Sequence, residues 1–217
     1  MLDISKYSMR VTDEFVLFWG GPCSNWFKIP IEGYLPVVVN FDDGRRALRK
    51  HPERMRFVHN EQFMMAGKST IFGDFDTLPT ILKEPDPQKV KDLGQKVQGF
   101  DQEVWNSSNV MLVAIGAYYK FTQYDDLYEF MLDHQGLRYV EGSPKDGIWG
   151  VKMRWDDPKI ENPENWRGQN RLGDALDVVS LMIREYGRDV DPYQVVGHAY
   201  RAVREERELV SPSPCMR

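Results

Sequence analysis

The chain of 217 residues is poor in the residue types that stabilise small secreted proteins or hold metal ions. It has two cysteines, Cys23 and Cys215, which are too few for a disulfide framework, and we expect both to stay reduced. Its four histidines show no metal-ligand spacing. The sequence therefore predicts a protein without a disulfide, a metal ion or another cofactor.

Long apolar runs are also missing. The most apolar stretch, residues 110–119, is only about half as long as a membrane-spanning helix. The first residues, MLDISKYSMRVTDE, do not combine a basic start with an apolar segment, so they do not resemble a secretory signal. We expect a soluble cytoplasmic protein that has no membrane partner.

Positive charge is scarce overall. The formal net charge is −5 and the isoelectric point is near 5.5, which argues against nucleic-acid binding through the field of the whole protein. The stretch 44–56 is an exception, because Arg or Lys occupies six of its thirteen positions. It indicates either a solvated charged insertion or an arm that contacts the phosphates of a nucleic acid.

The apolar fraction of 41% and the charged fraction of 28% are ordinary for a globular protein. Runs of β-formers bounded by turn residues predict strands at 15–18, 34–41, 55–59, 138–141 and 148–155, with a turn at Asp43-Gly44. Apolar spacing of three and four residues, together with capping residues, predicts helices from 60 and 86, at 101–120, 125–134 and 172–186, and from 191.

These patterns predict an α+β fold, with a small β-sheet surrounded by helices in one compact domain. We assign residues 1–190 to that domain, with an insertion at about 33–58, and residues 191–217 to a C-terminal helix and tail. The stretch 156–170 reads as a long loop, and such loops inside compact domains are usually functional or mobile.

Two blocks in the first third of the chain place polar groups beside aromatic rings. Phe18-Trp-Gly-Gly-Pro-Cys-Ser-Asn-Trp26 allows close backbone approach to a ligand at its glycines, or it is a turn with a core tryptophan. Glu61-Gln-Phe-Met-Met-Ala-Gly-Lys68 puts an acid and a lysine on one helix face. A lysine in that position becomes a nucleophile when burial lowers its pKa, whereas on an exposed helix both residues are unremarkable.

Two later blocks add further charged groups. Glu141 and Asp146 lie five positions apart across a Ser-Pro turn that precedes Trp149. Paired carboxylates are typical of glycosidic-bond cleavage, although an acidic β-turn has the same pattern. The block Trp166-Arg-Gly-Gln-Asn-Arg-Leu-Gly173 opens a helix, and a helix start beside an arginine suits a phosphate. The alternative is an ordinary helix start with Asn170 as its N-cap.

Together with two intervening blocks, these segments resemble the NADAR (YbiA-like) N-glycosidase family. The resemblance runs from Phe15 to about Tyr186 and rests on six blocks in order: Gly-Gly-x-x-Ser-Asn-Trp, Glu-Gln-x-Met-Met-x-x-Lys, Gly-x-x-Val-x-Gly-Phe, Lys-Phe-x-Gln, Ser-Pro-x-Asp-x-x-Trp-Gly and Trp-x-Gly-x-Asn-x-Leu-Gly.

The resemblance implies a hydrolase that cleaves the N-glycosidic bond between ribose and a nucleobase or amine. The substrate it favours is ADP-ribosylated guanine in a nucleotide or nucleic acid. Two alternatives stay open: ribosylaminopyrimidine phosphates of riboflavin biosynthesis, and an ADP-ribose- or NAD-binding module without catalysis. The implied catalytic residues are Glu61, Lys68 and Asp146, and the implied substrate-binding residues are Gly21, Ser24, Asn25, Trp26, Glu141, Trp149, Asn170 and Arg171.

Two mechanisms fit these residues. In the first, Lys68 attacks ring-opened ribose to form an imine while Glu61 or Asp146 moves protons. In the second, a carboxylate activates water for direct hydrolysis. Either mechanism predicts that Glu61, Lys68, Asp146 and Trp149 meet in one pocket, and that the loop 156–170 borders it. The sequence does not indicate an oligomeric state.

Overall fold

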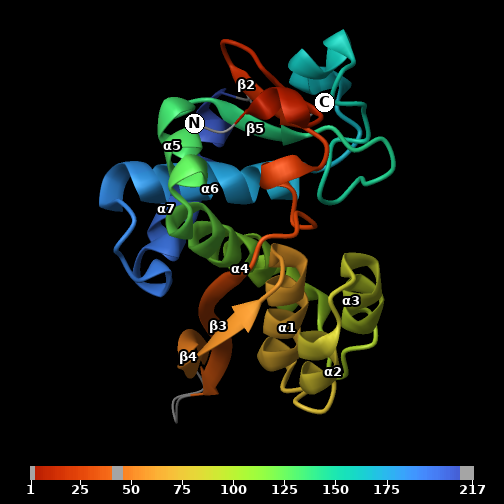
Figure 1. The fold of residues 1–217 in the computed structure, drawn as a ribbon, viewed down its shortest axis with the longest axis vertical. Helices are drawn as coiled ribbons and strands as arrows, with labels where there is room; N and C mark the ends of the chain where they lie inside the picture. Colours follow the sequence, from red (N-terminus) through yellow and green to blue (C-terminus); the bar gives the residue numbers. More distant parts are fainter. Residues whose placement is uncertain (1–2, 41–45, 211–217) are drawn as a thin grey trace, which may run out of the picture.

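The computed structural model describes residues 3–40 and 46–210, and its mixture of helices with a small sheet in one domain confirms the α+β prediction (Figure 1). Three strands, β1 (Met9–Val11), β2 (Phe15–Phe18) and β5 (Arg138–Glu141), form one sheet in the order β1-β2-β5. Strand β2 is antiparallel to β1 and parallel to β5. All four residues of β2 are buried, because this central strand has apolar groups packed against both of its faces.

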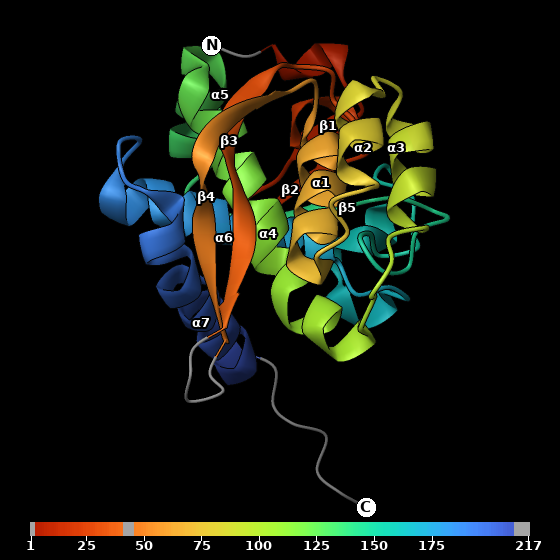
Figure 2. The ribbon, with the colours of Figure 1, turned by 90° about the horizontal axis from the view of Figure 1, so that it is seen from below.

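A separate hairpin pairs β3 (Ile31–Asn40) with β4 (Arg46–Phe57). Both strands are longer than the predicted 34–41 and 55–59, and the predicted Asp43-Gly44 turn lies outside the described residues. The pairing shifts register between Tyr34 and Pro36, where proline lacks the N–H that a regular ladder requires. The hairpin packs against α1 and α4 across the face shown in Figure 2.

The helices of the described residues are α1 (Asn60–Phe72), α2 (Leu78–Lys83), α3 (Pro87–Gly94), α4 (Gln102–Gln123), α5 (Asp125–Asp133), α6 (Arg171–Tyr186) and α7 (Pro192–Val210). Helix α4 contacts α1, α5, α6 and α7 and forms the centre of the molecule (Figure 1). Asp86 and Asp101 cap α3 and α4 as their sequence positions predict, each through hydrogen bonds accepted from backbone N–H groups. The short helix α2 was not predicted.

The predicted strand at 148–155 is wrong, because this segment is irregular backbone. Val151 and Met153 are buried, as an alternating strand pattern predicts. Their neighbours do not form a ladder, however: the N–H of Val151 donates to the carbonyl of Glu141, and the carbonyl of Val151 accepts from Arg167. Glycines at 147 and 150 and the left-handed Lys152 (φ 56°) bend the chain away from a strand.

Helix α1 is buried along nearly its whole length, including polar residues in its first turn. Gln62 shows why this is possible, since its side-chain amide donates to the carbonyls of Ile81, Leu82 and Glu84 at 3.0 to 3.1 Å. Because a buried polar group without partners costs free energy, these bonds fix α1 against the segment that follows it. None of the helices in the described ranges is sufficiently long and apolar to cross a membrane.

Candidate active site

Glu61 lies in the first turn of α1 and is 3% exposed. Its N–H donates to the backbone carbonyl of Asn25 at 2.9 Å, and its carboxyl group is hydrogen bonded by the side chain of Trp26. Burial raises the pKa of Glu61 to about 7, while Lys91 and the Trp26 bond oppose the shift and Asp146 adds to it. Near neutral pH this carboxyl group can therefore both hold and release a proton.

Glu141 and Asp146 face Glu61 from the end of β5 and the turn that follows it. One carboxylate oxygen of Asp146 accepts the N–H groups of Ile148 and Trp149 at 2.9 and 2.8 Å, which fixes the turn. Burial, followed by repulsion from Asp146 and Glu61, raises the pKa of Glu141 to about 8. The Oε2 atom of Glu141 is buried without a hydrogen-bond partner. Three acids from two distant segments thus share one electrostatic environment.

Lys91 on α3 is the cation that acts on this acid cluster, and sequence analysis did not single it out. Its charge lowers the pKa of both Glu61 and Glu141 against the larger effect of burial. Its Nζ also lies 6.0 Å from the ring centroid of Trp26. The sequence signal was weak, because Lys91 is one of two lysines on an amphipathic helix and the acids whose pKa it lowers, Glu61 and Glu141, lie 30 and 50 positions away.

Lys68 occupies a second position on α1, two turns after Glu61, or about 10 Å along the helix axis. Its Nζ donates to the carbonyl of Gly94 at 2.8 Å and lies 4.3 Å from the ring centroid of Phe100 and 5.3 Å from that of Trp105. Burial lowers its pKa, and a lower pKa increases the fraction of neutral, nucleophilic amine. The structure therefore brings Glu61, Glu141 and Asp146 together, whereas the Lys68 amine lies two helical turns further along α1 in an aromatic surround. That all of these residues share one pocket stays a prediction.

The predicted residues Gly21 and Ser24 lie in a loop that Lys120 holds in place. The fully buried Lys120 donates to the carbonyls of Pro22 and Ser24 at 2.6 and 3.1 Å, and burial lowers its pKa to about 8. Gly21 has a left-handed φ of 63°, and a Cβ atom there would meet the side chain of Tyr7 at 3.0 Å. These residues shape the loop that delivers Asn25 and Trp26 to the acid cluster.

The amide side chains of Asn25 and Asn60 form a bonded pair beneath Glu61. The Nδ2 of Asn60 donates to the Oδ1 of Asn25 at 2.8 Å and, at 3.4 Å, to the carbonyl of Val113 on α4. The Oδ1 of Asn60 is buried and has no partner. The pair therefore links the Gly-rich loop, α1 and α4 at the point where the site begins.

Asn170 and Arg171 connect the site to α6. Asn170 is fully buried in a left-handed conformation (φ 57°), and its side chain donates to the carbonyl of Tyr139 and accepts the N–H of Glu141. Asn170 is the N-cap residue of α6, as one reading of the sequence predicts, but its side chain makes no capping hydrogen bond. The side chain instead fixes the backbone that carries Glu141. The guanidinium of Arg171 bonds to Gln169 and Asn106 at 2.7 and 3.1 Å.

Only the end of the loop 156–170 lies beside the acid cluster. The N–H groups of Gln169 and Arg171 donate to the carbonyls of Gly147 and Ile148, in the turn that carries Asp146 and Trp149. Earlier in the loop, Trp166 packs against a second apolar cluster under β2 and β5. The first part of this loop is thus structural.

Asn109 on α4 is a further residue that sequence analysis missed. It is fully buried, and neither its amide nitrogen nor its amide oxygen has a hydrogen-bond partner. It lies one helical turn from Trp105, whose ring is beside Lys68, and one turn from Val113, whose carbonyl bonds to Asn60. Among the described residues, the two polar atoms of this side chain thus have no partner, and we infer that contact with a bound ligand could satisfy them. Its only sequence signal is a polar residue in an apolar helical stripe.

In the part of the chain that the structure describes, no three or more His, Cys, Asp or Glu side chains are grouped as metal ligands.

Comparison with known proteins connects this geometry to a family. The sequence pattern of the NADAR domain matches residues 24–184. Protein irg-1 of Caenorhabditis elegans is 33% identical over 172 residues, which are 77% of this chain and 79% of that protein. N-glycosidase R617 of Acanthamoeba polyphaga mimivirus is 31% identical over 183 residues, covering 80% and 96% of the two chains. The NMR structure of the E. coli protein YbiA has the same fold, with a TM-score of 0.57, 18% identity and coverage of 85% and 93%.

Proposed function

The chain belongs to the NADAR family and is an N-glycosidase, and from this premise we propose that it releases ADP-ribose from guanine bases of nucleotides or nucleic acid. The observation that carries the proposal is the grouping of Glu61, Glu141 and Asp146, with the half-buried amine of Lys68 two turns further along the helix that carries Glu61. Cleavage of an N-riboside needs a proton for the leaving base and a nucleophile for the ribose. The acids can supply the first and the Lys68 amine the second.

The acids supply the proton transfer. With pKa values of about 7 and 8, Glu61 and Glu141 are partly protonated at neutral pH. One of them donates its proton to the departing nitrogen, while an ionised neighbour accepts a proton from the attacking water or amine. Trp26, which is 40% exposed beside Glu61, offers a face on which the base stacks.

Lys68 supplies the nucleophile. Its neutral amine attacks the C1′ carbon of ring-opened ribose, the bond between C1′ and the base nitrogen breaks, and the imine that forms is hydrolysed by water. To reach the ribose, the amine exchanges its hydrogen bond to the Gly94 carbonyl for the substrate. The rings of Phe100 and Trp105 stabilise the cationic forms of Lys68, both the ammonium and the protonated imine.

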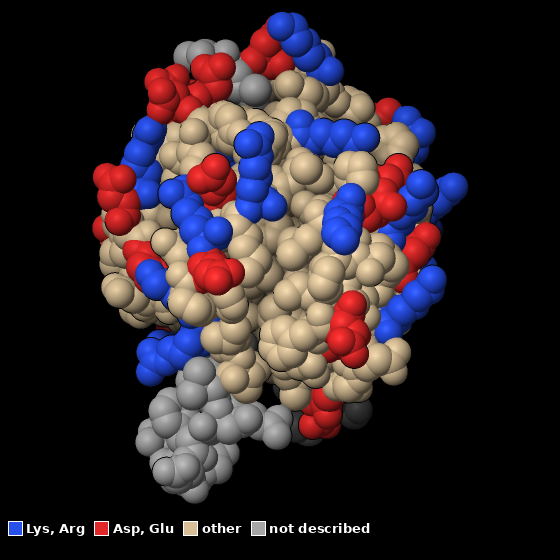
Figure 3. Space-filling model, turned by 60° about the horizontal axis from the view of Figure 1, so that its bottom comes forward, with Lys and Arg blue, Asp and Glu red and all other residues tan. Residues whose placement is uncertain are grey.

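The substrate is recognised mainly at the site itself. On the hairpin, Lys50 pairs with Asp191 at 2.6 Å and Arg54 pairs with Glu32 at 3.5 Å. On the face in Figure 3, Lys and Arg side chains are interspersed with Asp and Glu. Among the side chains that the structure describes, this pattern is not the continuous basic track that an extended nucleic acid prefers.

The test is turnover of ADP-ribosylated guanosine, followed by the release of free guanosine. A panel that includes ribosylaminopyrimidine phosphate and NAD identifies the leaving group, and release from the pyrimidine but not from guanosine would overturn the proposed substrate. Borohydride added during turnover should trap ribose covalently on Lys68. Lys68→Arg keeps the charge but cannot form an imine, so it should bind substrate and lose turnover. Near-wild-type turnover by Lys68→Arg would leave direct hydrolysis by the carboxylates.

A further inference from the structure

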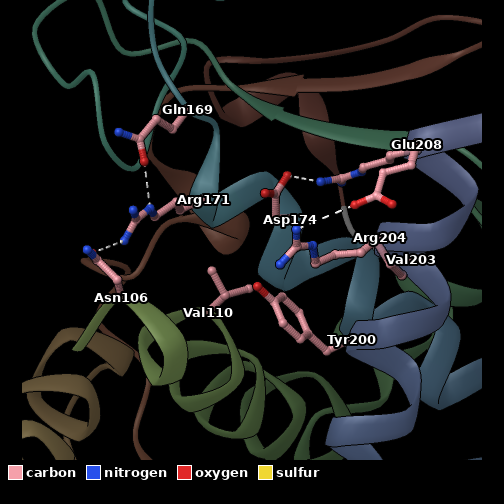
Figure 4. Close-up of a pocket in the computed structure, with 10 residues that line it drawn as sticks. Asn106, Val110, Gln169, Arg171, Asp174, Tyr200, Val203, Arg204 and Glu208 are labelled. Atoms are coloured by element: carbon pink, nitrogen blue, oxygen red, sulfur yellow. Dashed lines mark hydrogen bonds and ion pairs between the residues drawn. The ribbon is translucent and has the colours of Figure 1, made fainter. Parts of the chain in front are cut away.

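A hollow of about 710 Å³ lies between the start of α4, the start of α6 and the last helix, α7 (Figure 4). Asn106 and Val110 line it from α4, Arg171 from α6, and Tyr200 and Arg204 from α7. In Figure 4, Arg171 and Arg204 lie on opposite sides of Val110, with the Arg171 guanidinium turned toward Asn106 and Gln169 and the Tyr200 ring beneath Arg204. Its volume is within the range of small-molecule sites.

Two residues that line the hollow, Arg171 and Asn106, adjoin segments that carry the acid cluster and Lys68. Arg171 donates its N–H to Ile148 in the turn that holds Asp146. Asn106 directly follows Trp105, whose ring lies 5.3 Å from the amine of Lys68. A substrate that is cleaved beside Lys68 can therefore extend past the start of α4 into the hollow.

The three arginines of the hollow differ in how far they are neutralised. Arg207 makes partly buried ion pairs with Asp174 and Asp177, so both of these acids are occupied. The guanidinium of Arg171 hydrogen bonds to two neutral amides.

Arg204 is hydrogen bonded to the side chain of Tyr200 and forms an ion pair with Glu208 at 3.5 Å, with the Arg204 and Glu208 side chains 60% and 71% exposed. Such a surface pair stabilises weakly, so Arg171 and Arg204 are the cations that remain available to an anion.

An aromatic ring lies beside these cations. The guanidinium of Arg204 is 5.9 Å from the ring centroid of Tyr200, and Val110 and Val203 add an apolar floor. Two available arginines suit a phosphate, and a ring with an apolar floor suits a nucleobase.

We propose that this hollow binds the phosphorylated nucleoside part of the substrate, with its phosphate between Arg171 and Arg204 and its base against Tyr200. The proposal rests on the N-glycosidase function proposed above and names the end of the substrate remote from the cleaved bond. Helix α7 lies beyond residues 24–184, which the family pattern matches. The hollow would thus add substrate selectivity to the chemistry of the family.

The first test is a titration of the full chain with AMP and with adenosine, by calorimetry. AMP should bind at least tenfold more tightly than adenosine, because only AMP has the phosphate. Arg204→Gln and Tyr200→Ala should each weaken AMP binding roughly tenfold. Arg201→Gln, an exposed control on α7 that does not line the hollow, should bind AMP as the wild type does. Unchanged AMP affinity in both variants would overturn the proposal.

The second test separates the hollow from the reaction. With ADP-ribosylated guanosine, Arg204→Gln should raise KM roughly tenfold at unchanged kcat, whereas with ribosylguanosine, which lacks the phosphates, it should change neither. If no turnover is detected in the wild type, the proposed function fails, while variant-sensitive AMP binding still supports the hollow. If turnover occurs and KM is unaffected in both Arg204→Gln and Tyr200→Ala, substrate binding in the hollow is refuted and the proposed function stands. Thermal melts of all variants exclude misfolding as the cause.

Discussion

Replacing Glu61 by glutamine should make the protein more stable and less active. The pKa of Glu61 rises from a model-peptide value of 4.5 to about 7 in the folded protein, mainly through burial. Each unit corresponds to about 1.4 kcal/mol, so ionised Glu61 destabilises the folded state by about 3 kcal/mol relative to its protonated form.

The sign follows from proton binding. The folded protein holds the Glu61 proton more tightly than the unfolded chain does, so folding is favoured by this group below pH 4.5. That contribution is lost progressively as the pH rises to about 7 and stays absent above it. Glutamine is neutral throughout and keeps an oxygen that accepts the Trp26 bond. Glu61→Gln should therefore match the wild type near pH 4.5 and exceed it by about 3 kcal/mol at pH 8.5.

Urea unfolding at both pH values measures this difference. Because ionised Glu61 also raises the pKa of Glu141, the measured stability difference reflects the titration of both carboxyl groups. Glu206→Gln, on the exposed side of α7, is the control and should show no such pH-dependent gain. In Glu61→Gln, kcat should fall about 100-fold or more, because a proton-transfer group is lost. A stability difference that is equal at both pH values, or a fully active Glu61→Gln, would refute the assignment.

Two further predictions concern buried polar groups around the site. Lys120→Met should lower the free energy of unfolding by about 2–4 kcal/mol, because the carbonyls of Pro22 and Ser24 lose their donor. Urea unfolding measures this change, and a loss of less than about 1 kcal/mol would contradict the prediction. Asn109→Leu should raise stability by about 1–3 kcal/mol by removing two unpaired groups, while substrate KM rises; an unchanged KM would show that Asn109 does not contact substrate.

Sequence patterns predicted the local structure well wherever a local cause determines it. Asp86 and Asp101 mark their helices because a capping carboxylate acts over two or three residues. The segment 148–155 was mispredicted because its apolar alternation describes side-chain burial, while its backbone bonds go to Glu141 and to Arg167. The alternation of apolar residues along a segment carries no information about hydrogen-bond partners elsewhere in the chain.

The candidate site shows the same difference between residues that a local motif identifies and residues whose role depends on distant contacts. Glu61, Glu141 and Asp146 were identified from their motifs, and the structure groups them. Lys91 and Asn109 could not be identified, because the relevance of each depends on what lies against it: the acids for Lys91, and unpaired burial for Asn109. For Asn170 the sequence predicted a helix cap or a ligand contact, and the structure shows its side chain bonded to the backbone of β5.

The parallel pairing of β2 with β5 has a consequence for synthesis of the chain. It joins residues about 120 positions apart, Phe15 with Arg138 among them, so this contact cannot form until the ribosome has released most of the protein. Pairings across so long a separation close late and slowly. Glu61 is made early, but Glu141 and Asp146 follow β5 directly, and Asn170, which fixes Glu141, comes later still. A nascent chain that ends before Asn170 therefore carries an incomplete acid cluster.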